Sequence, residues 1–244
     1  MRAIESVHNG GIEGGSAGGC AGCVAASLSH MEHWAAIERE RTDLVDQLEG
    51  VSEEGWKTLS LCGAWTVRDV LAHLLSPLTP GVKRRFVVAM VKARGNFDRA
   101  NQLLTAGQAR LSTPELLAGL REHAASRFHP PGLGSEAPLT DVLVHGLDIR
   151  IPLGLDTDRA ADSWRSSLAF LCGPEARKGF IARPLPGLSL RATDVDLSAP
   201  VGGGGDEVTG PASALALALL GRTAWLDHLD GPGVPVLTKW AAGG

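Results

Sequence analysis

Two short stretches, DVLAHLL at residues 69–75 and DVLVHGL at residues 141–147, decide how this chain of 244 residues is interpreted. Each stretch places an aspartate four residues before a histidine, so both side chains lie on one face if the segment is helical. A carboxylate and an imidazole one turn apart can hold the same metal ion. The repeat therefore reflects chance, duplication, or two parts of one metal site.

The first stretch has a sufficient structural explanation for its aspartate. Thr66 is a good N-cap residue, and Asp69, three residues later, resembles a capping box with the shorter acid. An acid at this position also complements the helix dipole. His73 lies one turn further along and is flanked by leucines. A single histidine in such a setting is more often a hydrogen-bonded core residue than a metal ligand.

The second stretch has no capping explanation. Pro138 stands three residues before Asp141, and proline has no side-chain oxygen that could cap a helix. An acid favoured by the dipole of a first helical turn is still an alternative for Asp141. His145 follows one turn later, and Asp148 continues the same face. With a histidine from a second helix, Asp141 and His145 would give a two-nitrogen, one-oxygen ligand set with an open position, as in catalytic zinc sites.

The composition describes an ordinary globular protein with no sign of nucleic acid or membrane partners. Hydrophobic residues make up 44% of the chain and charged residues 20%, and the net charge is -4. The basic cluster at residues 83–85 is interpreted as a solvated helix face. No apolar run approaches the length of a membrane span. The spacing of the cysteines does not indicate a disulfide framework. Cys20 and Cys23 form a CxxC in a glycine-rich segment, which is weak evidence for a redox or zinc function. We expect a reduced, cytoplasmic protein.

The chain divides into three parts by composition and hydrophobic periodicity. Residues 1–30 lack periodicity and are rich in glycine, which predicts a disordered tail. Residues 31–180 contain amphipathic helical patterns with short connections, which favour an antiparallel bundle. The expected helices cover residues 31–50, 65–75, 82–104 with a bend near Gly95, 113–128 with Thr113 as N-cap, 138–154 and 157–173.

Residues 181–244 form a small α/β domain in this interpretation. Alternating apolar and polar residues over 187–202 predict a strand or a hairpin, and residues 207–210 predict a short strand. A helix follows over 211–222, with Pro211 near its start, and residues 233–237 predict a last strand. A module of this size is marginal alone, so we expect it to pack on the bundle.

The motifs resemble those of the mycothiol-dependent maleylpyruvate isomerase family, a branch of the DinB-like metal-binding four-helix bundles. SLCGAWTVRDVLAHL at residues 60–74 resembles the family's first motif, and DVLVHGLDIR at residues 141–150 its second. The segments at residues 187–198, 207–222 and 229–237 resemble its C-terminal sterol-carrier-like domain. The resemblance implies an α+β fold, a DinB-like antiparallel four-helix bundle followed by a small α/β sterol-carrier-like domain.

The resemblance also implies a metal site formed by His73, Asp141 and His145. The family's carboxylate ligand is usually glutamate, and this chain has the shorter Asp141. The two pentamers Asp-Val-Leu-x-His, at residues 69–73 and 141–145, then have unequal roles, because each supplies its histidine but only the second supplies its aspartate.

The function implied by the family is a metal-dependent reaction of a low-molecular-weight thiol. A divalent metal, zinc by expectation, would lower the pKa of the thiol, mycothiol, so that thiolate is present at neutral pH. The reaction would be an isomerisation or an S-transfer on a small electrophile of the maleylpyruvate type. Arg222 is the candidate for binding a substrate carboxylate, with a role at a helix C-terminus as the alternative. Cys62 is expected to pack near the helix start rather than act as a nucleophile.

Two other functions fit the same residues. A metal-bound water would suit a metallohydrolase, with Asp148 orienting a ligand or acting as a base. Alternatively, the chain is a ligand-binding protein whose bundle has lost catalysis. A thiol enzyme depends on added thiol, a hydrolase does not, and a binding protein keeps its ligand after chelation.

Overall fold

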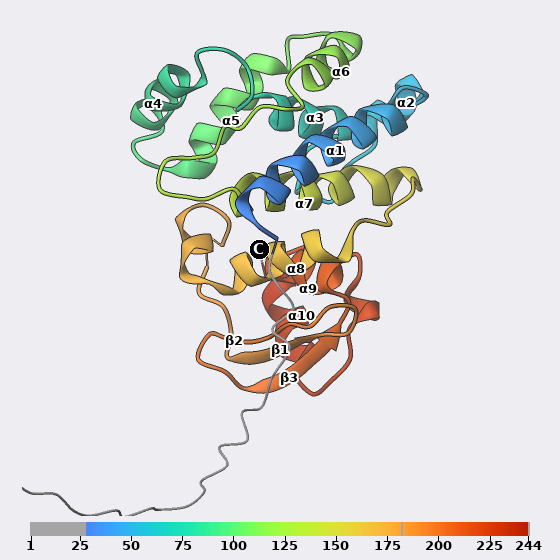
Figure 1. Ribbon diagram of the computed structural model, residues 1–244, viewed down its shortest axis with the longest axis vertical. Helices are drawn as coiled ribbons and strands as arrows, with labels where there is room; N and C mark the ends of the chain where they lie inside the picture. The colour runs from blue at the N-terminus through green and yellow to red at the C-terminus, as the bar shows by residue number, and fades with distance from the viewer. Residues whose placement is uncertain (1–27, 182, 244) are drawn as a thin grey trace, which may run out of the picture.

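The computed structural model describes residues 28–181 and 183–243, with one half built of helices and the other of helices and a small sheet (Figure 1). Most of the predicted tail, including Cys20 and Cys23, lies outside the described residues. The first helix, α1, begins at His30, one residue before the predicted start, and Ser29 caps it.

The N-terminal half is a helical bundle. Its main helices are α1 (His30–Leu48), α3 (Val67–Leu75), α6 (Thr113–Glu122) and α7 (Glu136–Leu153), with the short α2 (Glu53–Lys57) beside α3. Buried leucines from α1, α3 and α6, together with Trp56 of α2 and Ile149 of α7, form one hydrophobic core. Burial of this apolar face, more than helix propensity, holds such helices in place.

The prediction of one long helix over residues 82–104 is wrong. This part of the chain forms two helices, α4 (Val82–Lys92) and α5 (Phe97–Gln108), which pack against each other as a hairpin. Arg94 has φ of 54° and Gly95 has φ of 80°, and two successive left-handed residues end a right-handed helix. Asn96 then caps α5 by accepting a hydrogen bond from the Arg99 backbone N–H.

The helix starts decide two structural alternatives. The Thr66–Asp69 capping box predicted for α3 is confirmed, with both reciprocal hydrogen bonds present. The N-cap of α6 is Ser112, paired with Glu115, so the prediction of Thr113 was wrong by one residue. Because α7 begins at Glu136, Asp141 lies beyond the first turn, where the helix dipole gives an acid little stabilisation.

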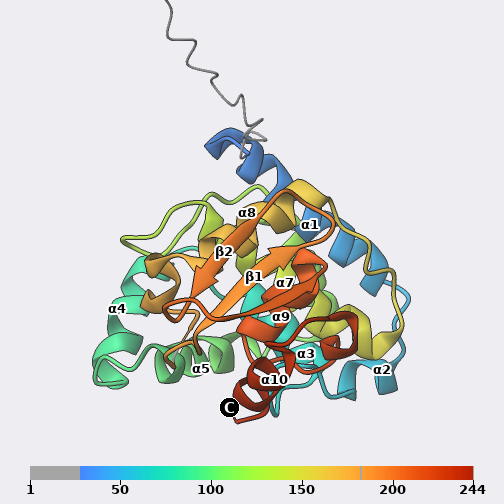
Figure 2. The same ribbon diagram turned by 90° about the horizontal axis from the view of Figure 1, so that it is seen from below.

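The C-terminal half is a three-stranded sheet covered by helices (Figure 2). Its elements are α8 (Ala161–Cys172), η1 (Pro174–Lys178), β1 (Leu188–Ala192), β2 (Ser198–Val201), β3 (Asp206–Gly210), α9 (Ala212–Leu219), η2 (Leu226–His228) and α10 (Val234–Ala242). The strand order is β2-β1-β3, with β1 antiparallel to β2 and parallel to β3. The predicted α+β class is therefore confirmed.

The strand predicted at residues 233–237 is wrong, because this segment begins α10. Pro235 lies in the first turn, where its missing N–H costs nothing. Leu237 and Ala241, four residues apart, are the buried residues of the helix. The segment GVPVL was too short for its period to distinguish strand from helix.

One hydrophobic core joins the two halves. It combines Trp34 and Ile37 of α1 with buried residues of α7, α8, α9 and the sheet. Helix α7 therefore contacts the bundle on one side and the C-terminal half on the other, which fixes the loop after α9 relative to α7. Among the described residues no helix combines the length and apolar character needed to cross a bilayer.

Candidate metal centre and adjoining cavity

Three side chains from two helices meet on the wall of one cavity. His73 comes from α3, and Asp141 and His145 come from α7. The Nε2 atoms of His73 and His145 lie 3.5 and 3.6 Å from the same oxygen, Oδ1 of Asp141. The two imidazole centroids are 4.7 Å apart. The structure thus brings together the three residues that the sequence suggested as ligands.

These distances fit ligands that share one ion. Two atoms each about 2.1 Å from a tetrahedrally coordinated zinc lie about 3.4 Å apart. The separations of 3.5 and 3.6 Å are close to that value and longer than a good hydrogen bond. One ligand atom from each of the three residues falls within a common 4.8 Å. The donor set, two imidazoles and a carboxylate, therefore fits a divalent cation, while ligation itself stays a prediction.

Asp148 fixes the orientation of the His145 ring. Nδ1 of His145 lies 2.9 Å from Oδ2 of Asp148, which is fully buried. An ionised carboxylate only accepts hydrogen bonds, so Nδ1 carries a proton toward Asp148, and Nε2 is the nitrogen that would bind an ion once its own proton is lost. Carboxylate–histidine pairs of this kind orient the imidazoles that bind metals in proteins.

Arg222 completes the chain of contacts from the C-terminal half. Its Nε and Nη2 donate to Oδ1 and Oδ2 of Asp148 at 3.1 and 2.8 Å, a two-pronged pair. Its Nη1 donates to the carbonyl of Leu220 at the end of α9. Through the Leu220 carbonyl, Arg222 does contact the C-terminus of a helix, as the alternative role required. Its main partner is nevertheless Asp148.

The charges of this cluster depend on one another. Burial disfavours the charged form of His145, but hydrogen bonds to Asp148 and the Cys62 thiol, with the charge of Asp141, raise its pKa to about 10. Burial also disfavours ionised Asp141, yet His73, His145 and Arg41 together lower its pKa below the usual value. Burial disfavours ionised Asp148 as well, but hydrogen bonds and charges from His145 and Arg222 lower its pKa, so both aspartates are ionised at neutral pH.

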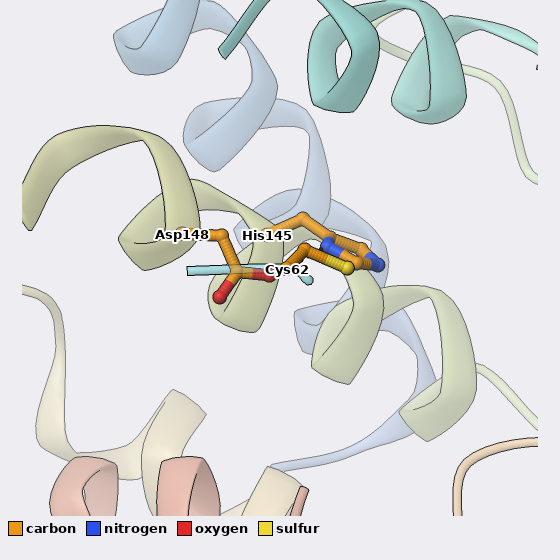
Figure 3. A group of neighbouring side chains, drawn as sticks. All are labelled: Cys62, His145 and Asp148. Carbon is orange, nitrogen blue, oxygen red and sulfur yellow. Dashed lines mark hydrogen bonds and ion pairs between the residues drawn. The ribbon is translucent and has the colours of Figure 1, made fainter. Parts of the chain in front are cut away.

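A second group of possible ligands is less suitable for an ion. Cys62 and Asp148 both lie beside the His145 ring (Figure 3), and the three residues offer ligand atoms within 4.8 Å of one another. Both oxygens of Asp148 already accept hydrogen bonds from Arg222. A metal there would have to displace a buried ion pair, which is costly. Cys62 is a free, half-buried thiol, and its expected packing role stays a prediction.

Two further residues contribute to the site and were missed from the sequence. Arg41 of α1 is 4% exposed, and its Nη1 donates to the carbonyls of Ala124 and Ser126. Burial lowers its pKa to about 10 against the opposing effect of Asp141. Thr105 of α5 places its hydroxyl 3.4 Å from Nδ1 of His73. Neither residue belongs to a sequence motif, because each reaches the site only through the packing of its helix against the others.

The cluster opens into a cavity of about 500 Å³. His73, Asp141, His145 and Arg222 line it, with walls from the α4–α5 hairpin and from the loops before α7 and after η1. A second cavity of about 320 Å³ borders Cys62 and Arg222 from the side of α10. The larger volume lies in the range of small-molecule sites in proteins.

Residues 37–150 match the family model of the mycothiol maleylpyruvate isomerase N-terminal domain. This helical segment belongs to that domain family. The matched range contains His73, Asp141, His145 and Asp148, whereas Arg222 lies outside it. The resemblance seen in the sequence motifs is thus confirmed.

Solved structures with the same overall fold come from this family. A crystal structure of the mycothiol-dependent maleylpyruvate isomerase matches with a TM-score of 0.56 at 18% identity over 84% of this chain and 93% of the other. A histidine-to-alanine mutant of the mycothiol-dependent maleylpyruvate isomerase matches with a TM-score of 0.58 at 17% identity and the same coverage. At this identity the likeness shows the fold. No curated protein matches the sequence.

Proposed function

We propose that this chain is a metal-dependent enzyme that uses mycothiol either to isomerise a small electrophile of the maleylpyruvate type or to act on it as an S-transferase. The observation that carries the proposal is the convergence of His73, Asp141 and His145 on one cavity, at separations suited to a shared divalent ion. The domain family of residues 37–150 supports the choice of thiol.

The bound groups would supply the reactive chemistry and the chain would position it. A divalent cation, zinc by our proposal, lowers the pKa of a thiol beside it, and thiolate adds reversibly to a carbon–carbon double bond conjugated with a carbonyl group. His73, Asp141 and His145 would hold the cation. Asp148 would keep the His145 Nε2 lone pair directed toward it through the 2.9 Å hydrogen bond.

Arg222 would bind the carboxylate of the electrophile. Its contact with Asp148 holds the guanidinium at the cavity edge and leaves further N–H groups for a second acceptor. The cavity walls would exclude water, which strengthens this charge interaction. Since Asp148 contacts both His145 and Arg222, one carboxylate would set the metal ligand and the substrate anchor at once.

Metal analysis combined with assays of isomerisation and of thiol consumption tests the proposal. Purified protein should contain close to one divalent metal per chain. It should either isomerise an α,β-unsaturated carbonyl substrate only when mycothiol is present, with the thiol regenerated, or consume mycothiol only when such a substrate is present. Arg222→Lys should lower kcat/KM at least about tenfold, because a charged two-pronged contact is lost. Arg191→Lys is the matched control, since Arg191 pairs with Glu207 on the exposed side of the sheet.

Other results would point to the other functions. Turnover of an ester or amide without added thiol would replace the proposal with a metallohydrolase. Stable metal binding without any turnover, and with a ligand retained after chelation, would replace it with a binding protein.

A further inference from the structure

A buried arginine of α1 lines the larger cavity from the side of the helical bundle. Arg41 is 4% exposed, and its Nη1 donates to the backbone carbonyls of Ala124 and Ser126, both at 2.9 Å. A guanidinium has five N–H groups, so three remain on Nε and Nη2. These two nitrogens donate to no residue that the structure describes, and neither is fully enclosed by protein. Because Arg41 lines the cavity, its free donors are open to a ligand there.

The charges of Arg41 and Arg222 act at different turns of α7. Burial lowers the pKa of Arg41 only to about 10, so it is charged at neutral pH, and its charge lowers the pKa of Asp141. Arg222 instead pairs with Asp148. The two aspartates are seven residues apart, or about two helical turns. One arginine therefore reaches the candidate ligand cluster from the bundle and the other from the C-terminal half.

The charges around the cavity favour anionic ligands once the ion is counted. A divalent cation and the two arginines would bring four positive charges, and the ionised Asp141 and Asp148 bring two negative charges. Among the described lining residues, no other arginine, lysine, aspartate or glutamate is present besides Arg41, Asp141 and Arg222. The chain thus leaves two positive charges without compensation, which attracts ligands that carry more than one negative charge.

Each arginine has enough free donors for one carboxylate. After its hydrogen bonds to Asp148 and the Leu220 carbonyl, Arg222 keeps one N–H on each terminal nitrogen. Arg41 keeps Nε and Nη2, whose parallel N–H groups match the two oxygens of a carboxylate. An electrophile of the maleylpyruvate type carries a carboxylate at each end of an unsaturated keto chain. Arg222 alone would leave one of these carboxylates without a partner.

We propose that Arg41 is the second substrate anchor of this site and binds the carboxylate at the end of the electrophile remote from Arg222. This inference rests on the proposed function and deepens it, because it gives each carboxylate of the substrate its own arginine. Nη1 of Arg41 fixes the side chain through two carbonyls, while Nε and Nη2 bind the ligand. A ligand held at both ends has its unsaturated carbons positioned beside His73, Asp141 and His145.

Binding of unreactive acids tests the second anchor apart from turnover. We would titrate the purified protein, with its metal content measured, with heptanedioate and with heptanoate by calorimetry. The two acids share one carbon chain and differ in one carboxylate. Heptanedioate should bind at least about tenfold more tightly, because a charged hydrogen-bonded contact is added. Equal binding of the two acids, or tighter binding of heptanoate, would overturn the inference.

Matched arginine variants show whether Arg41 supplies that contact. At equal metal content, Arg41→Gln should weaken heptanedioate binding about tenfold and leave heptanoate nearly unchanged. Arg68→Gln should alter neither, because Arg68 also donates to two backbone carbonyls, those of Ala109 and Leu111, but does not line the cavity. Equal heptanedioate affinities of the two variants would remove Arg41 from the ligand site.

A second variant keeps the test decisive if Arg41→Gln does not fold. Arg41→Lys retains the charge but loses the two-pronged geometry, so heptanedioate should bind several-fold more weakly than to the wild type. Heptanoate should bind with the wild-type affinity. An unchanged affinity of Arg41→Lys for heptanedioate would contradict the proposed contact.

Turnover separates this inference from the proposed function. With mycothiol and an unsaturated keto dicarboxylate, Arg41→Gln should lower kcat/KM at least about tenfold, and it should affect the half-ester, which has one carboxylate, far less. Thiol-dependent turnover that Arg41→Gln leaves unchanged would overturn the second anchor and keep the thiol enzyme. Heptanedioate binding that depends on Arg41, without thiol-dependent turnover of the keto acid, would overturn the proposed function and keep the anchor.

Discussion

At the residue scale, the two pentamers give the same residue types different surroundings. Asp69 accepts hydrogen bonds from the backbone and hydroxyl of Thr66, so its charge serves the start of α3. Asp141 lies inside α7, beyond the first turn, between two imidazoles. The sequence suggested this difference because Thr66 precedes Asp69 where Pro138 precedes Asp141. Identical local sequence therefore leads to a cap in one helix and a candidate ligand in the other.

Asp141 is the residue where metal binding is best tested. Asp141→Ala should lower the affinity for a divalent metal at least about tenfold, since two imidazoles alone would remain. Asp141→Glu should keep the metal, because it restores the carboxylate that the family usually has. Metal content after dialysis against a weak chelator gives the measurement.

Asp69→Ala is the matched control for that experiment. It removes the same residue type from the corresponding position of the other pentamer, and it should cost about 0.3–1.5 kcal/mol of stability without loss of metal. Metal occupancy that is the same in Asp141→Ala as in Asp69→Ala would remove Asp141 from the site.

The buried histidine His33 should make the stability of the folded protein depend on pH. It is 2% exposed on α1, with Nδ1 3.0 Å from the Ser135 hydroxyl. Burial lowers its pKa, against the opposing charges of Glu136 and Glu32 and with a small contribution from His30. The unfolded chain therefore binds a proton near the ordinary pKa of about 6.5, before the folded chain does. Stability from this group should fall as the pH drops below about 7 until the lower folded pKa is reached.

The measurement is chemical denaturation of the wild type and of His33→Asn at several values between pH 7 and pH 5. Asparagine keeps a hydrogen-bonding group near the position of Nδ1 but does not titrate in this range. The variant should lose less stability over this interval than the wild type. Equal slopes in the two proteins would show that His33 does not carry this pH dependence.

At the element scale, α7 contains buried polar residues and a glycine, Gly146, that leaves space for one of them. Arg150 is fully buried, and its Nε donates to Oε1 of Gln47 on α1 at 2.7 Å. A Cβ added at Gly146 would lie 2.3 Å from Nη1 of Arg150. Gly146 thus leaves the space in which the Arg150 guanidinium folds back along its own helix. The same helix presents Asp141, His145 and Asp148 to the site.

Gly146→Ala should therefore reverse the usual effect of this substitution. In an open helix position, alanine stabilises by about 0.5–1 kcal/mol relative to glycine. At Gly146 the added methyl group overpacks a buried arginine, which costs about 1–3 kcal/mol. Gly107→Ala in α5 is the control, since a Cβ there meets no atom within 4 Å and should give the ordinary gain. Thermal unfolding of both variants measures the signs, and a stabilised Gly146→Ala would contradict this account of Arg150.

The element boundaries show where sequence reasoning succeeded and where it failed. Capping at Thr66 and the hairpin of β1 and β2 followed from local patterns, because neighbouring residues make those contacts. A bend near Gly95 was predicted where the helix in fact ends. Arg94 adopts a positive φ, which is uncommon for arginine and so is not indicated by the sequence. The contacts of Arg41 and Arg150 join distant helices, and no local pattern encodes them.

At the scale of the whole molecule, the two halves share one core and one polar chain. Helix α7 contributes Leu139, Leu143 and Leu147 to the same cluster as Leu215 and Leu217 of α9. Arg222, after α9, pairs with Asp148 of α7. Helix α1 adds residues to both hydrophobic clusters. Such sharing predicts that the halves do not unfold independently.

Hydrogen exchange of Leu217→Ala tests this cooperativity. Leu217 is fully buried in α9, and its truncation should cost about 2–5 kcal/mol. If the described residues unfold as one unit, the slowest-exchanging amides of α3 should lose as much protection as those of α9, although α3 does not contact Leu217's helix closely. Protection lost in α9 but retained in α3 would instead assign separate stabilities to the halves. The candidate metal ligands would then belong to a bundle that holds its fold alone, and Arg222 would join them only when the C-terminal half is folded.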